Sequence, residues 1–144
     1  MFDPSQADVR RFFCDTWNKH QRRLPLTPLE SIALSWIALH PEYHDDLADL
    51  EQALTAQYPV EAGRTNPFLH LSMHLAIAEQ LSIDQPPGIV AAYQRLSARL
   101  DDPHEAAHRI MDCLGEVVWV AQRDHLPPDG EAYLACILRQ AGSL

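Results

Sequence analysis

Apolar residues along this chain recur three and four positions apart, which is the spacing of one face of an α-helix. Capping residues divide this pattern into segments. Ser5, Thr27, Asn66 and Asp102 each offer a side-chain oxygen just before an apolar run, and a proline directly follows the last three. No stretch alternates apolar and polar residues as a half-buried strand does. The pattern therefore predicts an all-α fold.

The same signals predict seven helical segments, of which the fourth and the sixth are long and central. We expect them to form one compact domain over residues 1–144, a bundle of about six or seven helices, with the longest loop at residues 58–65. The segments run from about Ser5 to Gln21, Thr27 to Leu39, Pro41 to Gln57, Asn66 to Asp84, Gly88 to Leu100, Asp102 to Asp124 and Asp129 to Gln140.

Composition and charge narrow the classes of function. Of the 144 residues, 47% are hydrophobic and only five are glycine, which is typical of a folded, soluble protein. The formal net charge of −9 would repel a phosphate backbone, so we expect no nucleic-acid partner. No apolar run reaches the length of a membrane span, and the start MFDPSQADVRRFF lacks the features of a signal peptide. We therefore expect a cytoplasmic protein with no membrane partner.

The number and spacing of the cysteines also favour a cytoplasmic location. Cys14, Cys113 and Cys136 are odd in number and far apart in the sequence. We interpret them as reduced thiols that fill small positions in the core.

The histidines are not randomly distributed along the chain. Six of the eight form three pairs four residues apart, where random placement would give roughly 0.4 such pairs. Side chains four apart lie on one face of a helix, so each pair can present two imidazoles in one direction. The pairs are His40 and His44 in HPEYH, His70 and His74 in HLSMH, and His104 and His108 in HEAAH, while His20 and His125 stand alone and are interpreted as surface residues.

HEAAH also matches the H-E-x-x-H pattern of zinc proteases, in which two histidines bind the metal and the glutamate activates a water molecule. The surroundings oppose this interpretation. No strand is predicted that could hold a peptide substrate, and Asp102 and Pro103 place His104 in the first turn of its helix. We therefore treat HEAAH as one of three histidine pairs rather than as a protease motif.

The helical phase of two pairs favours a shared metal ion. Steps of about 100° place His70 and His74 on an apolar stripe, and His104 and His108 adjoin an apolar arc of the other long helix. Packing the two stripes together would bring four imidazoles to one place, where an ion satisfies several buried nitrogens at once. We predict a transition-metal site there, with Zn or Fe as the expected cofactor, although imidazole-rich coordination also suits Ni and Cu.

The predicted ligand set adds the third pair and two acids of the neighbouring helical strip. It comprises His40, His44, His70, His74, His104, His108, Asp112 and Glu116. If the site is catalytic, the metal is a Lewis acid or redox centre, and Asp112, Glu116 or Glu79 is the candidate base. The alternative is a non-catalytic interaction module, which binds a protein partner or further copies of this chain and whose histidines form a hydrogen-bonded core network.

Several strings, taken together, resemble a known family. HPEYH, NPFLHLSMHLAI, EQLSIDQPPGI and H-x-x-x-H-x-I-M-x-C-L-G-E occur in this order, and the chain is similar to domain-of-unknown-function family 1841, uncharacterised small bacterial proteins, from VRRFF to Tyr133. The resemblance implies no particular activity. A looser similarity to bundles that hold iron pairs is weakened because only Glu105 and His108 form the E-x-x-H signature, which those bundles use twice.

Overall fold

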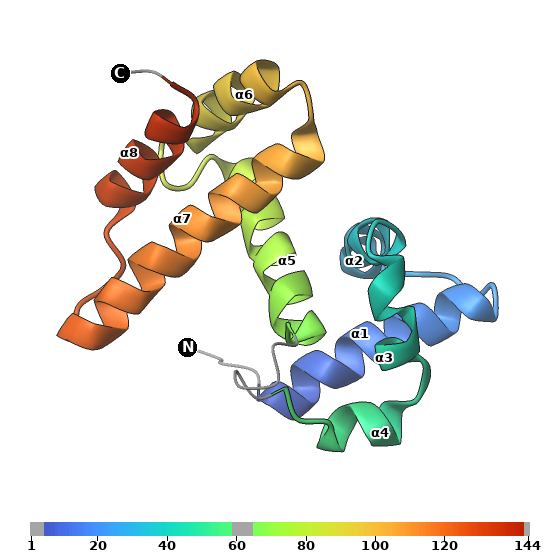
Figure 1. Cartoon of the computed structure of the whole chain (residues 1–144). Helices are drawn as coiled ribbons and strands as arrows, with labels where there is room; N and C mark the ends of the chain where they lie inside the picture. The colour runs from blue at the N-terminus through green and yellow to red at the C-terminus, as the bar shows by residue number, and fades with distance from the viewer. Residues whose placement is uncertain (1–4, 59–64, 143–144) are drawn as a thin grey trace. The chain divides into compact units, whose positions relative to one another are not determined.

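The computed structural model describes residues 5–58 and 65–142, which contain α-helices, one 3-10 helix and no strand. This confirms the all-α prediction. The predicted loop at residues 58–65 lies largely outside the described residues, and no described helix has the length and apolar content that a bilayer crossing requires. The elements are α1 (Gln6–Gln21), α2 (Pro28–Ala38), η1 (Pro41–Tyr43), α3 (His44–Ala48), α4 (Leu50–Thr55), α5 (Pro67–Ile83), α6 (Ile89–Leu100), α7 (Pro103–Asp124) and α8 (Gly130–Gln140) (Figure 1).

The chain divides into two compact units, Met1–Leu75 and Ala76–Leu144, with the boundary inside α5. Each unit buries an apolar core of its own. The core of the first unit includes Phe13, Ile37 and Leu71, and that of the second includes Ile110 and Ile137. One domain over residues 1–144 therefore stays a prediction.

Helices begin where the capping residues predicted them to begin. The Ser5 and Thr27 hydroxyls each accept a hydrogen bond from the backbone N–H three residues ahead and start α1 and α2. The Asp102 carboxylate starts α7 by accepting from the backbone N–H groups of the next turn. In α2 the carboxylate of Glu30 accepts a hydrogen bond from the Thr27 N–H and pairs with Lys19, and these contacts lower the pKa of Glu30.

The prediction of one continuous helix over residues 41–57 is wrong. The structure divides it into η1, α3 and α4, and Asp49 separates the last two in an extended conformation, with φ −126° and ψ 110°. The Asp49 carboxylate accepts hydrogen bonds from the backbone N–H groups of Glu51 and Gln52, so it caps a new helix instead of continuing the old one.

In the first unit, α1 packs against α2, α3 and α4. A buried arginine lies at the contact with α4. Nη1 of Arg10 donates hydrogen bonds of 2.7 Å to the carbonyl oxygens of both Ala53 and Ala56, at the end of α4. The guanidinium also lies 5.2 Å from the ring centroid of Phe68. Arg10 therefore satisfies carbonyls that have no partner within α4.

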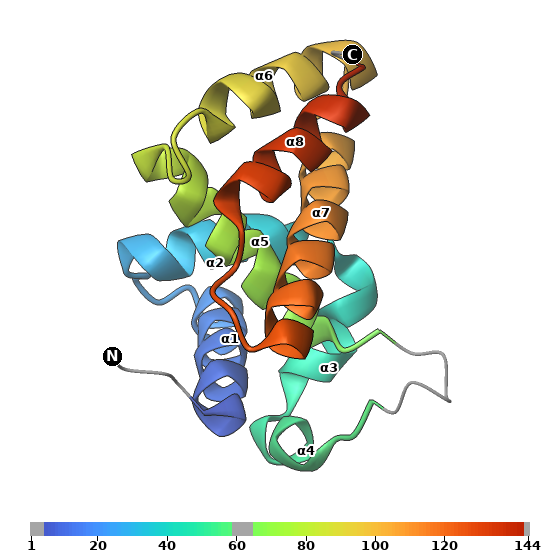
Figure 2. The same ribbon diagram turned by 90° about the vertical axis from the view of Figure 1, so that its left-hand side faces the viewer.

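In the second unit, α6, α7 and α8 pack against one another (Figure 2). The Tyr133 hydroxyl donates a 2.7 Å hydrogen bond to Gln80 and so joins α8 to the end of α5. A disulfide between Cys113 and Cys136 joins α7 to α8, with their Cα atoms 5.8 Å apart. The prediction of reduced thiols is therefore wrong for these two cysteines, because helix packing brings together positions 23 residues apart. Cys14 is free and buried.

This arrangement predicts the reactivity of all three sulfurs. Burial raises the pKa of the Cys14 thiol to about 11, so little thiolate is present at pH 8. We expect iodoacetamide to modify no cysteine of the native protein, one after unfolding in denaturant, and three after unfolding with reductant, as counted by intact-mass spectrometry. Three modified residues in denaturant without reductant would contradict the disulfide.

Candidate metal centre

His40 is held at the end of α2 with a defined ring orientation. It is 3% exposed, and Pro41 after it favours an extended backbone that ends the helix. The His40 Nδ1–H donates a 2.7 Å hydrogen bond to the carbonyl oxygen of Trp36. A neutral imidazole with its proton on Nδ1 carries a lone pair on Nε2, so this bond selects the tautomer in which Nε2 accepts a hydrogen bond or binds a metal.

His70 and His74 lie one turn apart near the start of α5. The Asn66 side chain accepts hydrogen bonds from the N–H groups of Phe68 and Leu69 and so fixes the beginning of this helix. His74 is fully buried and His70 is half-buried. Their Nε2 atoms are 3.1 Å apart, which confirms that the i, i+4 spacing directs both rings to one place.

His40, His70 and His74 of the first unit lie together, and His70 Nε2 is close to the Nε2 atoms of both others. His70 Nε2 lies 3.2 Å from His40 Nε2 as well as 3.1 Å from His74 Nε2. The nearest nitrogens of His40 and His74 are themselves within 4.8 Å of each other. We call these three residues the histidine triad.

Two such contacts at one nitrogen restrict the chemistry of the triad. Nε2 of a neutral imidazole carries either one proton or one lone pair, so His70 can serve both neighbours only by sharing a single proton between them. A metal ion bound by His70 and its two neighbours accounts for the two short distances without that restriction. Zinc–nitrogen bonds of about 2.0–2.1 Å at tetrahedral angles place two ligand nitrogens about 3.4 Å apart.

Aromatic side chains pack around the triad. The Trp36 ring stacks on His74 at a centroid distance of 4.0 Å, and Tyr43 stacks on His40 at 5.3 Å. Burial raises the pKa of the Tyr43 hydroxyl. Sequence reasoning missed Trp36 and Tyr43, although they lie only four residues before and three residues after His40 in the sequence.

His44 does not share a helical face with His40, because η1 separates His40 from the start of α3. The His44 Nε2–H donates a 2.9 Å hydrogen bond to the carbonyl of Ile37, and the ring stacks on Trp17 at 4.1 Å. The prediction that the two histidines of HPEYH share one helical face is therefore wrong. The hydrogen bond leaves the lone pair on Nδ1, so a ligand role for His44 stays a prediction.

His104 and His108 form a pair within the second unit. Their ring centroids are 4.5 Å apart on α7, each offers a nitrogen within 4.8 Å of the other, and both are half-buried. Glu105 pairs with Arg109 at 3.1 Å on the exposed side of the helix. Because HLSMH and HEAAH lie in different units, one ion shared by both strings stays a prediction.

The acids proposed as ligands or bases lie at exposed positions. Asp112 and Glu116 are exposed on α7, and Glu116 lines a cavity formed with α8. Glu79 is exposed on α5. Their roles at a metal site stay predictions. His20 and His125 are exposed, as expected of surface residues.

Comparison with known proteins finds one relationship. No curated protein matches the chain, and no solved structure matches it. A family model described as Domain of unknown function (DUF1841) matches residues 5–139, which is nearly the whole chain. The matched region contains all three histidine pairs and confirms the resemblance seen in the motif strings, so the chain belongs to the DUF1841 family.

Proposed function

We propose that this chain binds a transition-metal ion and that the histidine triad supplies ligands to it. The observation that carries the proposal is the position of His70 Nε2, 3.1–3.2 Å from two other imidazole nitrogens. The hydrogen bond from His40 to the Trp36 carbonyl supports it, because metal-binding histidines ordinarily donate their other ring N–H to such a partner.

The three imidazole ligands indicate which class of metal ion the triad would bind. Three neutral imidazoles suit Zn, Fe, Ni or Cu, whereas Mg and Ca prefer carboxylate and carbonyl oxygens. Three protein ligands also leave one position of a tetrahedral ion open, as at catalytic zinc sites, where a bound water or substrate is polarised. A metal-dependent enzyme or a redox protein is the activity we propose for such a centre. The sequence suggests an alternative to a water or substrate at the open position. In this alternative a further protein ligand, His104 or His108, occupies it.

The competing function is the interaction module with a histidine core network. The same nitrogen distances arise if His70 shares one proton with its two neighbours, and no metal is then needed. The metal content of the protein decides between the two functions.

We expect untagged protein to contain about one equivalent of a transition metal, measured by elemental analysis after dialysis. Added Cu²⁺ should quench the fluorescence of metal-free protein, because Trp36 stacks on a triad ring. The quench should be smaller in Trp36→Phe than in Trp119→Phe, since Trp119 is an exposed residue of the second unit, and the quench that is left in Trp36→Phe comes from Trp17 of the first unit. Equal quenching in both variants would place Cu²⁺ away from the triad.

A further inference from the structure

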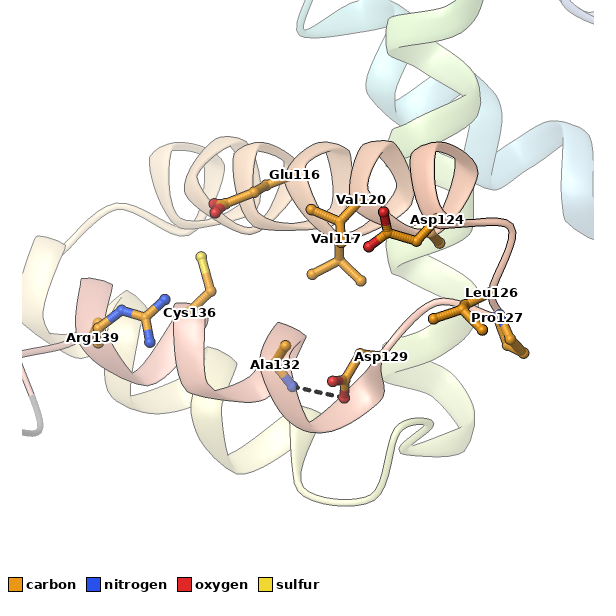
Figure 3. A pocket seen from close by; sticks show the side chains of 11 residues that line it. Glu116, Val117, Val120, Asp124, Leu126, Pro127, Asp129, Ala132, Cys136 and Arg139 are labelled. Atoms are coloured by element: carbon orange, nitrogen blue, oxygen red, sulfur yellow. Dashed lines mark hydrogen bonds between the residues drawn. The ribbon is translucent and has the colours of Figure 1, made fainter.

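The second unit contains a cavity of about 330 Å³ between α7, α8 and the segment that joins them. Figure 3 shows its lining side chains. Val117 and Val120 of α7 form one wall, and Ala132 and Cys136 of α8 form the other. Ala121 of α7 also lines the cavity. The volume suits a small organic molecule, and the walls are mainly apolar.

Carboxylates lie at both ends of this apolar cavity. Glu116 and Arg139 lie toward one end, and Asp124 and Asp129 lie toward the other end (Figure 3). Glu116 and Asp124 are eight residues apart on α7, a distance of about 12 Å along the helix axis. Three carboxylates and one guanidinium give the lining a net charge of −2.

The carboxylates keep capacity for a ligand. Both Asp124 oxygens accept hydrogen bonds from Arg123, at 2.9 and 3.1 Å, but the two side chains are exposed, at 42% and 54%, and each oxygen has a second lone pair that can accept from a ligand. Asp129 uses Oδ1 to accept the N–H groups of Glu131 and Ala132 at the start of α8. Its second carboxylate oxygen can accept from a ligand at the same time.

We propose that this cavity binds a linear aliphatic diamine or polyamine. One ammonium group lies at Glu116, the methylene chain lies along Val117 and Val120, and a second ammonium group lies at Asp124 and Asp129. The net charge of the lining favours a dication over an anion, and the apolar middle favours methylene groups over a polar chain. A monoamine of equal length leaves one acidic end without a cation.

Isothermal titration of the full-length protein with 1,8-diaminooctane tests this assignment. We expect it to bind about fivefold more tightly than octylamine or 1,3-diaminopropane, since one exposed ion pair contributes up to about that factor. Glu116→Gln and Asp129→Asn should each weaken binding by about fivefold, and asparagine retains the helix cap. Glu105→Gln, which removes an exposed acid of the same helix outside the cavity, should bind as the natural protein does.

Equal binding of octylamine and 1,8-diaminooctane, or equal losses in Glu105→Gln and Glu116→Gln, would overturn the proposal and indicate general attraction to an acidic surface. Absence of detectable diamine binding would overturn it as well. Metal content measured in Asp129→Asn keeps this result separate from the proposed metal function, because Asp129 lines the cavity and belongs to no predicted ligand set.

Discussion

Alanine in place of His70 is expected to reduce bound metal from about one equivalent to less than a tenth, because His70 Nε2 contacts both other triad nitrogens. Loss of one of three ligands should weaken affinity by at least about 100-fold, more than loss of a group behind a ligand does. Free metal at 1,000 times its Kd stabilises the folded state by about 4 kcal/mol. We expect added Zn²⁺ to raise the Tm of the natural protein by about 10 °C and that of His70→Ala by almost nothing.

Two further variants show whether the loss of metal is specific to the triad. His20→Ala removes an exposed histidine outside the triad and should retain both the metal and the thermal shift. His74→Ala should lose both, with a further loss of stability because His74 is fully buried. If natural protein contains less than a tenth of an equivalent and added metal leaves its Tm unchanged, the metal function is wrong and the core network replaces it.

The same assay tests the ligands that only the sequence suggests. Reduced stoichiometry in His104→Ala or His108→Ala would make the second unit a donor to the same ion, and unchanged stoichiometry would remove that pair from the ligand set. The metal stoichiometry is interpreted in the same way for three other variants, His44→Ala, Asp112→Asn and Glu116→Gln.

Methionine in place of Arg10 is expected to lower the free energy of unfolding by about 3 kcal/mol and the Tm by about 10 °C. The side chain is 8% exposed and donates to two carbonyl oxygens at 2.7 Å, so the change leaves both acceptors without their donor. Methionine fills much of the same volume, which separates the lost hydrogen bonds from an empty cavity. Urea denaturation followed by circular dichroism measures the difference.

Arg11→Met is the control. Arg11 follows Arg10 on the same helix but is exposed, so this substitution should change the free energy of unfolding by less than about 0.5 kcal/mol. Arg10→Lys should fall between the two, since an ammonium group cannot reproduce the planar geometry of the guanidinium. Equal effects in Arg10→Met and Arg11→Met would show that the carbonyl contacts contribute little to stability.

Most helix boundaries could be predicted because the interactions that begin a helix are local. Ser5, Thr27 and Asp102 bond to N–H groups two or three residues ahead, and these bonds depend on a few neighbouring residues. The break at Asp49 was missed although it uses the same chemistry. There, the apolar spacing over residues 41–57 outweighed the capping signal that Asp49 gives to Glu51 and Gln52.

The sequence by itself determined which residues could carry chemistry, because side chains four apart share a helical face wherever the helix is continuous. That holds for His70 with His74 and for His104 with His108, and it fails for His40 with His44, where η1 intervenes. Only the tertiary structure decided that His40 meets His70, thirty residues away, and that Cys113 bonds to Cys136. Helical periodicity fixes which face of a helix is buried, whereas the height and angle at which two helices cross depend on how their side chains interlock.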